Sequence, residues 1–360
     1  MIPMIHKLLF STLQKIFSIP FFIIDLLSPT FYLKRLRAKI VEYKKSTSPH
    51  LAIFVVHQKN NLPFYVRNMV EALLANHMKV VVVVNGEATS DTKNYLELNC
   101  HTVIYRKNTG RDFGAYQDAL SNEVIDDFQK VLLVNDSVFY FKKNLNALIG
   151  DTLKNKQDWI AFYDNYNSGY HAQSFFLCFG PAVLRSKAFK IFWRNYRPFN
   201  LRHRIIKEGE LKLSHALMDA EFQCHVIMNA SDLGRNLRAL KETELLHLKD
   251  FLTVFFLKHH PEILGKEGRL FIQHLVFGCE SYPPVSHGLY AIFGILNDVG
   301  VFKRDLALRQ MTTVDEFQLL LEEMKLDPYE IKAALAEFSL DARSRPRSLF
   351  DKIKFRFDLV

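Results

Sequence analysis

The stretch that decides the fold reads VIYRKNTGRDFGAY at residues 103–116 and KVLLVNDS at residues 130–137. In each part a short apolar run rich in β-branched residues ends in a polar cluster, so each cluster is expected at the carboxyl end of a strand. Ligands of open α/β sheets bind in the crevice outside those strand ends. One cluster is basic and contains glycine, whereas the other is acidic. Together they suggest an anionic ligand with a metal.

The same pattern continues on both sides of this stretch. Apolar runs that predict strands alternate with helical spacing, and the expected strands are 51–56, 80–84, 102–105 and 131–134. Strands that alternate with helices imply a mostly parallel, doubly wound α/β sheet with flanking helices. The chain is less regular after this. Strands are expected at 158–162, 174–179 and 225–228, helices at 186–193 and 205–218, and helices and loops over 231–305.

The C-terminal part predicts a helical extension. Thr313 and Glu316 form a capping box for a helix that ends at Met324, and Asp327 followed by Pro328 starts a second helix to residue 338. We expect a helical hairpin over residues 306–340, appended to an α/β domain at 50–305 as a packing or partner module.

The charge balance of the 360 residues is basic, with a formal net charge of +9 and a pI near 9.2. A nucleic acid, an acidic membrane surface and a phosphorylated small molecule would all suit that sign. Much of the positive charge lies near the two ends, which favours the membrane surface. Nucleic-acid binding is not expected, because the periodic region lacks basic patches interleaved with aromatic residues.

The two ends suggest contact with an anionic membrane. Residues 1–45 combine apolar runs with basic residues, but Lys15, Pro20, Asp25 and Pro29 make each run too short for a spanning helix. We expect an in-plane amphipathic anchor, with a core-packing helix, a true span and a targeting signal as alternatives. The basic tail at 341–360 suits a second membrane contact or a solvated tail. The predicted location is cytoplasmic, peripheral on the inner face of the plasma membrane.

The four cysteines are far apart and form no C-x-x-C pair. Buried free thiols in a reducing compartment are the expected state, and a zinc site is not.

The two motifs resemble the signature of the rhamnan-synthesis F family of glycosyltransferase-like proteins. The matching patterns are N-x-G-R-D-x-G-A-Y from Asn108 and L-x-N-D-S from Leu133. Further matches follow in the family's order over residues 50–305: His171-Ala172-Gln173-Ser174, Phe189–Trp193, Gly209-Glu210-Leu211, Ser286-His287-Gly288 and Phe302-Lys303. The resemblance implies a domain of the glycosyltransferase A type that uses a nucleotide-diphosphate sugar. Its implied role is bacterial surface polysaccharide synthesis, and the family name points to rhamnose from dTDP-rhamnose.

Asp136 is the first candidate for chemistry, as a ligand of Mg²⁺ or Mn²⁺. A strand-end carboxylate flanked by Asn135 and Ser137 offers hard oxygen ligands for an ion that bridges two phosphates. By resemblance, N-D-S stands where sugar-nucleotide transferases carry an Asp-x-Asp metal motif, although only one of its three residues is a carboxylate. The alternative is a polar turn that follows a strand.

The basic cluster is expected to hold the phosphates, together with Asn108. Arg111 offers a fork for two phosphate oxygens, and Gly110 would let the backbone approach them at a helix N-terminus. Asp112 would orient Arg111 or accept a sugar hydroxyl. The alternative is an ion pair between Arg111 and Asp112 that closes the start of the helix.

Other strand ends supply further ligand candidates. His57 and Asn85 follow the first two strands, where they would meet the nucleotide base and ribose, or merely make the loops polar. By resemblance, His287 and Lys303 would close over the diphosphate, or pair with a surface carboxylate. Gln173 is a further ligand candidate on the family match.

The proposed chemistry needs a base that deprotonates the acceptor hydroxyl. The candidates are Glu210, His171 and Asp164, and the sequence does not choose among them. The acceptor would be a lipid-linked or polymeric glycan, attacked by direct displacement while the metal and Arg111 hold the departing diphosphate. The alternative function is a non-catalytic scaffold that binds a sugar nucleotide or glycan in a membrane assembly complex.

Overall fold

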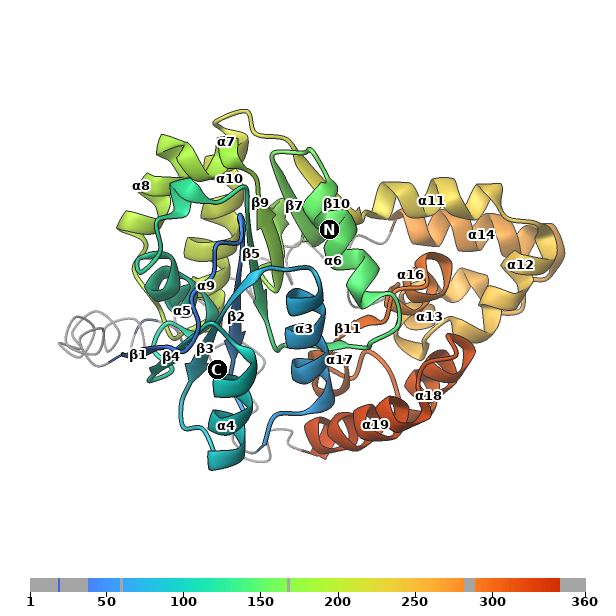
Figure 1. Ribbon diagram of the computed structural model, residues 1–360. Coiled ribbons are helices and arrows are strands. Elements are labelled where there is room, and N and C mark those ends of the chain that lie inside the picture. The colour runs from blue at the N-terminus through green and yellow to red at the C-terminus, as the bar shows by residue number, and fades with distance from the viewer. Residues whose placement is uncertain (1–18, 20–37, 59–60, 167–168, 282–288, 344–360) are drawn as a thin grey trace.

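A mixed sheet of nine strands runs through the N-terminal two-thirds of the chain (Figure 1). The computed structural model describes residues 19, 38–58, 61–166, 169–281 and 289–343. The strand order is β1-β4-β3-β2-β5-β9-β7-β10, with β8 paired to β7. The strands are β1 (Lys39–Glu42), β2 (His50–Val56), β3 (Lys79–Asn85), β4 (Thr102–Arg106), β5 (Lys130–Asn135), β7 (Trp159–Asn165), β8 (His171–Ala172), β9 (Phe176–Phe179) and β10 (Cys224–Met228).

The four strands β4, β3, β2 and β5 are parallel and form the centre of the sheet. They are buried along nearly their whole length, as expected for parallel strands covered on both faces. Chain order runs outward from β2 in both directions, so the topological switch point lies between β2 and β5. Among the described strands of this sheet, β1, β8 and β9 run antiparallel to the rest. The predicted mostly parallel sheet is confirmed.

Helices cover both faces of the sheet. Alternate side chains of β2 enter two separate cores, with Ala52 and Phe54 in one and Leu51 and Ile53 in the other. The first core includes residues of α3 (Phe64–Ala75), α4 (Ser90–Asn99) and α6 (Leu145–Lys154). The second includes residues of α5 (Arg111–Leu120), α7 (Pro181–Arg185) and α8 (Lys187–Asn195). This is the doubly wound arrangement that the sequence predicts.

The region after β10 is helical, as expected for residues 231–305. Figure 1 shows α11 (Ala230–Ala239), α12 (Glu242–His247) and α14 (Gly268–Ser281) extending away from the sheet, with α13 (Val254–His259) and α16 (Tyr290–Asn297) nearer to it. Then β11 (Val301–Lys303) pairs antiparallel with β6 (Val138–Tyr140). In this register Lys303 lies opposite Val138, so two motifs far apart in the sequence become neighbours.

The C-terminal hairpin consists of α18 (Val314–Glu323) and α19 (Pro328–Arg343). The capping box of Thr313 and Glu316 is present, and the Asp327 carboxylate accepts hydrogen bonds at the start of α19, as predicted. Apolar residues of both helices share the core of α3. The buried Glu330 accepts a hydrogen bond of 2.6 Å from the Asn68 amide of α3. The hairpin is therefore built into the domain rather than appended to it.

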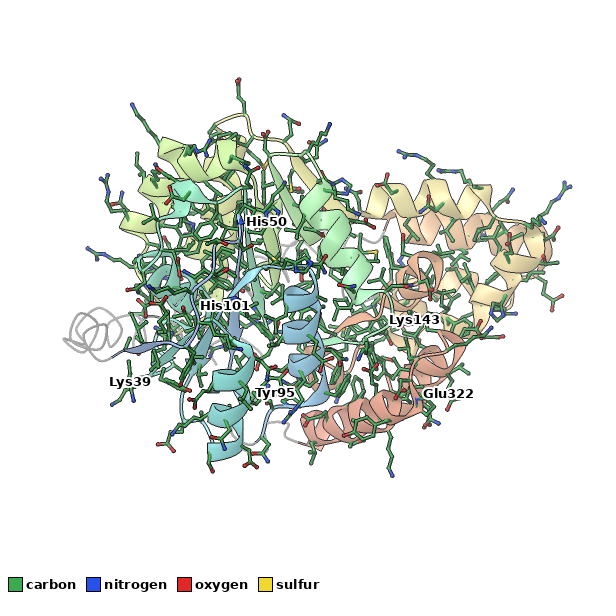
Figure 2. All side chains as sticks on the ribbon, viewed as in Figure 1. Lys39, His50, Tyr95, His101, Lys143 and Glu322 are labelled. Carbon is green, nitrogen blue, oxygen red and sulfur yellow. The ribbon has the colours of Figure 1, made fainter. Side chains whose placement is uncertain are left out.

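A lysine also ties this hairpin to the sheet layer. Lys143, labelled in Figure 2 between the sheet and the C-terminal helices, donates a hydrogen bond of 2.7 Å to the Met324 carbonyl at the end of α18.

The predicted anchor at residues 1–45 is wrong for its last part. Residues 39–42 form β1, which pairs antiparallel with the edge of β4. Ile40 and Val41 are β-branched and suit a strand, and the open edge of β4 offers backbone groups that need partners. Residues 1–18 and 20–37 and the tail at 344–360 lie outside the described residues. No helix in the described part is long and apolar enough to cross a membrane.

Three cysteines, Cys100, Cys178 and Cys224, are free thiols. Burial raises the pKa of each to about 12, so they are protonated and unreactive at neutral pH. The prediction of buried free thiols is confirmed for Cys100 and Cys178, whereas Cys224 is half-buried.

Candidate functional site

A cavity of about 380 Å³ lies at the carboxyl end of β5. Segments from the whole chain meet there: the start of α5, the end of β5, the turn between β8 and β9, the helix after residue 201, and β11 with the turn that follows it. The lining residues are Arg111, Asp112, Asn135, Ser137, Asn165, His171, Gln173, Ser174, Phe175, Arg202, Ile205, Ile206, Glu210, Lys303, Asp305 and Arg309. Eight of the predicted site residues are therefore brought together around one space.

The start of α5 is shaped by a close contact with a proline. Gly110 and Arg111 both have left-handed backbone conformations, with φ of 73° and 47°. A Cβ on Gly110 would lie 2.1 Å from the Cβ of Pro198, and the Gly110 N–H donates a 2.8 Å hydrogen bond to Asn200. Glycine is thus needed for packing against the 198–200 segment. The left-handed arginine is strained, a feature that often marks functional sites.

Arg111 and Asp112 both line the cavity, but they do not form the ion pair considered as the alternative. Burial lowers the pKa of the Arg111 guanidinium, and nearby Arg202 adds to the effect. Asp112 accepts a 2.9 Å hydrogen bond from the Asn135 amide. Burial and then the neighbouring Asp136 raise the pKa of Asp112 to about 7. This carboxyl therefore keeps its proton to a higher pH than an ordinary aspartate does.

The Asn-Asp-Ser motif turns its residues in alternate directions. Asn135 and Ser137 line the cavity, whereas Asp136 is buried behind it. The Asp136 carboxylate accepts hydrogen bonds from the His57 N–H at 2.8 Å and from the Gln58 amide at 2.5 Å. Asp136 therefore braces the end of β2 against the end of β5, and it is not placed as the predicted metal ligand.

Three other residues that were predicted to contact the ligand do not line the cavity. Asn85 is buried at the end of β3, where its side-chain oxygen accepts from Arg106 and its amide donates to the Arg111 carbonyl. His57 lies beside it, with Nδ1 2.6 Å from the Asn85 carbonyl. Asn108 is exposed. Asn85 and His57 hold the loop before α5 in place. From the sequence, a polar residue at a strand end could have this structural role or bind a ligand. His287 lies outside the described residues.

One wall of the cavity carries a positioned carboxylate. Glu210 Oε1 accepts hydrogen bonds from the Ser174 hydroxyl at 2.6 Å and the Ser174 N–H at 3.0 Å. Its other oxygen, Oε2, lies 3.5 Å from Nε2 of His171. His171 is buried, and its Nδ1 lies 2.8 Å from the Gly169 carbonyl. Asp164, the third candidate base, is buried in β7 and does not line the cavity, so it cannot reach an acceptor there.

A π-helical turn places Glu210. The helix after residue 201 consists of α9 (Arg202–Ile205), the π turn η3 (Ile206–Leu211) and α10 (Lys212–Met218). A Cβ on Gly209 would lie 2.9 Å from the Phe113 ring, so glycine lets the wide turn approach α5 closely. Such turns occur often at functional sites. Helical spacing predicted this helix but not its π turn.

Four cations also line the cavity, and the sequence did not single out two of them. Lys303 was expected there, and its Nζ lies 5.7 Å from the centre of the Phe175 ring. Arg202 and Arg309 were missed, and both contact Asp305 Oδ2, at 3.3 Å and 3.0 Å. The only signal for Asp305 and Arg309 was their closeness to the family match at residues 302–303.

Comparison with known proteins agrees with the motifs. A family model described as rhamnan synthesis protein F matches residues 80–260, about half of the chain. Uncharacterized protein y4gN of Sinorhizobium fredii is 29% identical over 223 residues, which cover 60% of this chain and 57% of that protein. The chain thus spans a little over half the length of this relative.

Two solved structures of similar proteins are glycosyltransferase GlyE of Streptococcus pneumoniae TIGR4 and TarS 1–349 of S. aureus, each 12% identical to this chain. The GlyE match covers 83% of this chain and 66% of that one, with a TM-score of 0.36. The TarS match covers 82% and 90%, with a TM-score of 0.30. The family model includes the cavity-lining residues from Arg111 to Glu210. The chain belongs to the rhamnan synthesis protein F family.

Proposed function

We propose that this protein transfers a sugar from a nucleotide-diphosphate donor to a glycan acceptor, with Glu210 as the base. The observation that carries the proposal is a cavity lined both by cations and by a positioned carboxylate. A sugar nucleotide needs positive charge at its diphosphate, and its acceptor hydroxyl needs a proton acceptor. Family membership supports the same reaction class, and the family's description favours rhamnose as the sugar.

Glu210 is a better candidate base than His171 or Asp164. Ser174 occupies Oε1, which leaves Oε2 as the oxygen that takes the acceptor proton. His171 faces that same oxygen from a buried position. If Nδ1–H of His171 donates to the Gly169 carbonyl, Nε2 has a lone pair that can accept a hydrogen bond from Glu210 after this carboxylate has taken the acceptor proton. His171 then acts as a positioning residue for the base.

The acceptor and the cellular location extend the proposal. We propose a lipid-linked or polymeric glycan as the acceptor, and a peripheral position on the cytoplasmic face of the membrane. The support is the basic and apolar composition of the two ends of the chain.

The test is turnover with a panel of nucleotide sugars that includes dTDP-rhamnose. Glu210→Gln is expected to lower kcat roughly 10²–10⁴-fold, because general-base catalysis contributes that much, with little change in donor affinity. Glu208→Gln is the matched control. Glu208 lies two residues earlier on the same π turn and pairs with Arg204 and Lys212, outside the cavity.

Two outcomes would count against the proposal. Wild-type turnover in Glu210→Gln would remove this residue as the base. If the wild-type protein binds a sugar nucleotide but transfers nothing to any glycan tested, the alternative of a non-catalytic binding scaffold is favoured.

A further inference from the structure

Two cations in the cavity wall form no ion pair within 4 Å among the described residues. Across the described part of the chain, neither the Arg111 guanidinium nor the Lys303 ammonium has a hydrogen-bond or ion-pair partner. Burial is the main effect and lowers the pKa of both groups. Asp112 offsets part of this for Arg111, and Asp305 and Glu210 offset part of it for Lys303, while Arg202 lowers the pKa of each group further. Three positive charges therefore face one small space. A bound anion would relieve both the repulsion and the lost hydration.

The carboxylates in the cavity neutralise this charge only in part. Asp305 is held by Arg202 and Arg309, and Glu210 accepts from Ser174. Asp112 accepts from Asn135, and burial raises the pKa of its carboxyl. Four cations and three carboxylates line the cavity, so an excess of positive charge remains in it.

The strand-end motif does not fit a divalent metal. Mg²⁺ is bound through carboxylates, but the two residues that face the cavity, Asn135 and Ser137, are neutral. The Asn135 side-chain oxygen already accepts from the Ser137 N–H at 3.0 Å and from its hydroxyl at 2.6 Å. The one carboxylate of the motif, Asp136, points away and is hydrogen-bonded. Within the described residues, no three His, Cys, Asp or Glu side chains are grouped to hold a metal ion.

We infer that Arg111, Arg202 and Lys303 hold the donor's diphosphate directly, and that binding and transfer need no divalent metal. This inference rests on the proposed function. As the bond between the anomeric carbon and the phosphate oxygen breaks, its electron pair leaves with the nucleoside diphosphate, next to these three cations. The acceptor oxygen forms the new bond to the anomeric carbon, and its proton passes to Glu210. Fixed cations stabilise the leaving group as a metal would, without rearranging during the step.

Binding of thymidine diphosphate and uridine diphosphate to the full chain tests this directly, by calorimetry in EDTA and in excess Mg²⁺ or Mn²⁺. We expect equal affinity in EDTA and in metal for whichever diphosphate binds. Lys303→Met and Arg111→Met should weaken binding about 10-fold or more, since charge-assisted hydrogen bonds to phosphate are lost. Lys303→Arg, which keeps the charge, should retain most of the affinity. Lys142→Met is the control, because Lys142 is an exposed lysine just after β6 that pairs with Glu71.

The outcomes separate this inference from the proposed function. Binding that appears only with metal, binding of neither diphosphate, or unchanged binding by a folded Lys303→Met variant overturns the cation clamp. Sugar transfer that persists in EDTA supports it, and transfer that EDTA abolishes leaves the proposed function standing while the clamp fails. Metal-free diphosphate binding without sugar transfer leaves the clamp standing while the transferase proposal fails. Thermal unfolding of each variant shows whether it is folded.

Discussion

The two strand-end motifs use their charged residues in opposite ways. In the motif at the start of α5, the charged residues Arg111 and Asp112 face the cavity, and Gly110 packs against Pro198. In the motif after β5, the charged residue Asp136 is packed inside, and the neutral Asn135 and Ser137 face the cavity. A charge in a motif is therefore no evidence of ligand contact by itself. The direction in which the local backbone points each side chain determines its role.

The largest expected loss of stability comes from adding a methyl group at Gly110. Gly110→Ala should destabilise the protein by about 3 kcal/mol, since left-handed strain adds to a clash with Pro198. Gly265→Ala is the matched control, because Gly265 has nearly the same φ, 71°, and no atom within 4 Å of the new Cβ. It should cost only about 1 kcal/mol, from strain alone. Equal costs in chemical unfolding would mean that Pro198 does not determine the conformation at Gly110.

Asp136 is expected to matter for stability more than for ligand binding. Asp136→Ala should cost about 2 kcal/mol, because the His57 N–H and the Gln58 amide lose their acceptor. Asp136→Asn keeps an oxygen for the His57 N–H and should recover part of that loss. Calorimetry on Asp136→Asn should show nucleoside diphosphate binding close to wild type. Metal-dependent binding that this substitution abolishes would return Asp136 to the role that the sequence first suggested.

The smallest effect is a pH dependence from Asp112. Its pKa of about 7 in the folded protein is well above the usual 3.8, so the folded chain keeps this proton over a range in which the unfolded chain has lost it. Stability from this group therefore falls as pH rises from about 4 to about 7. Asp112→Asn removes that decline, so its Tm relative to wild type should rise over the same range and then level off. The gain should be of the order of 1 kcal/mol, because Asp112 is partly exposed. A constant Tm difference from pH 4 to pH 8 would contradict the raised pKa.

Much of the fold could be predicted because its signals are local. Valine-rich runs such as residues 80–84 suit buried parallel strands, and the capping box of Thr313 predicted where α18 starts. The errors arose where tertiary contacts prevail. Residues 39–42 read as part of a basic amphipathic anchor, but backbone pairing with β4 makes them a strand. The C-terminal hairpin looked separate because the hydrogen bond from the Asn68 amide to the Glu330 carboxylate joins residues far apart in the sequence.

The sequence predicted where the site lies better than it predicted which side chains line it. Strand ends located Arg111, Asp112 and Asn135, and the resemblance added Glu210 and Lys303. The sequence could not show that Asp136 turns inward, because the hydrogen bond from the His57 N–H forms only when β2 and β5 are paired. The sequence did not identify Arg202 or Arg309 either, because they lie on separate segments that meet at the cavity only in the folded chain.

The pairing of β11 with β6 has a consequence for synthesis on the ribosome. The four central strands are complete once residue 135 has been made, but Lys303 joins the site only when β11 reaches β6. A nascent chain can thus form its central strands while one wall of the cavity is still missing. Premature termination before residue 301 would leave a product without Lys303, Asp305 and Arg309. Such a fragment would contain Arg111 and Arg202 but lack Lys303, so the proposed cation clamp would be incomplete.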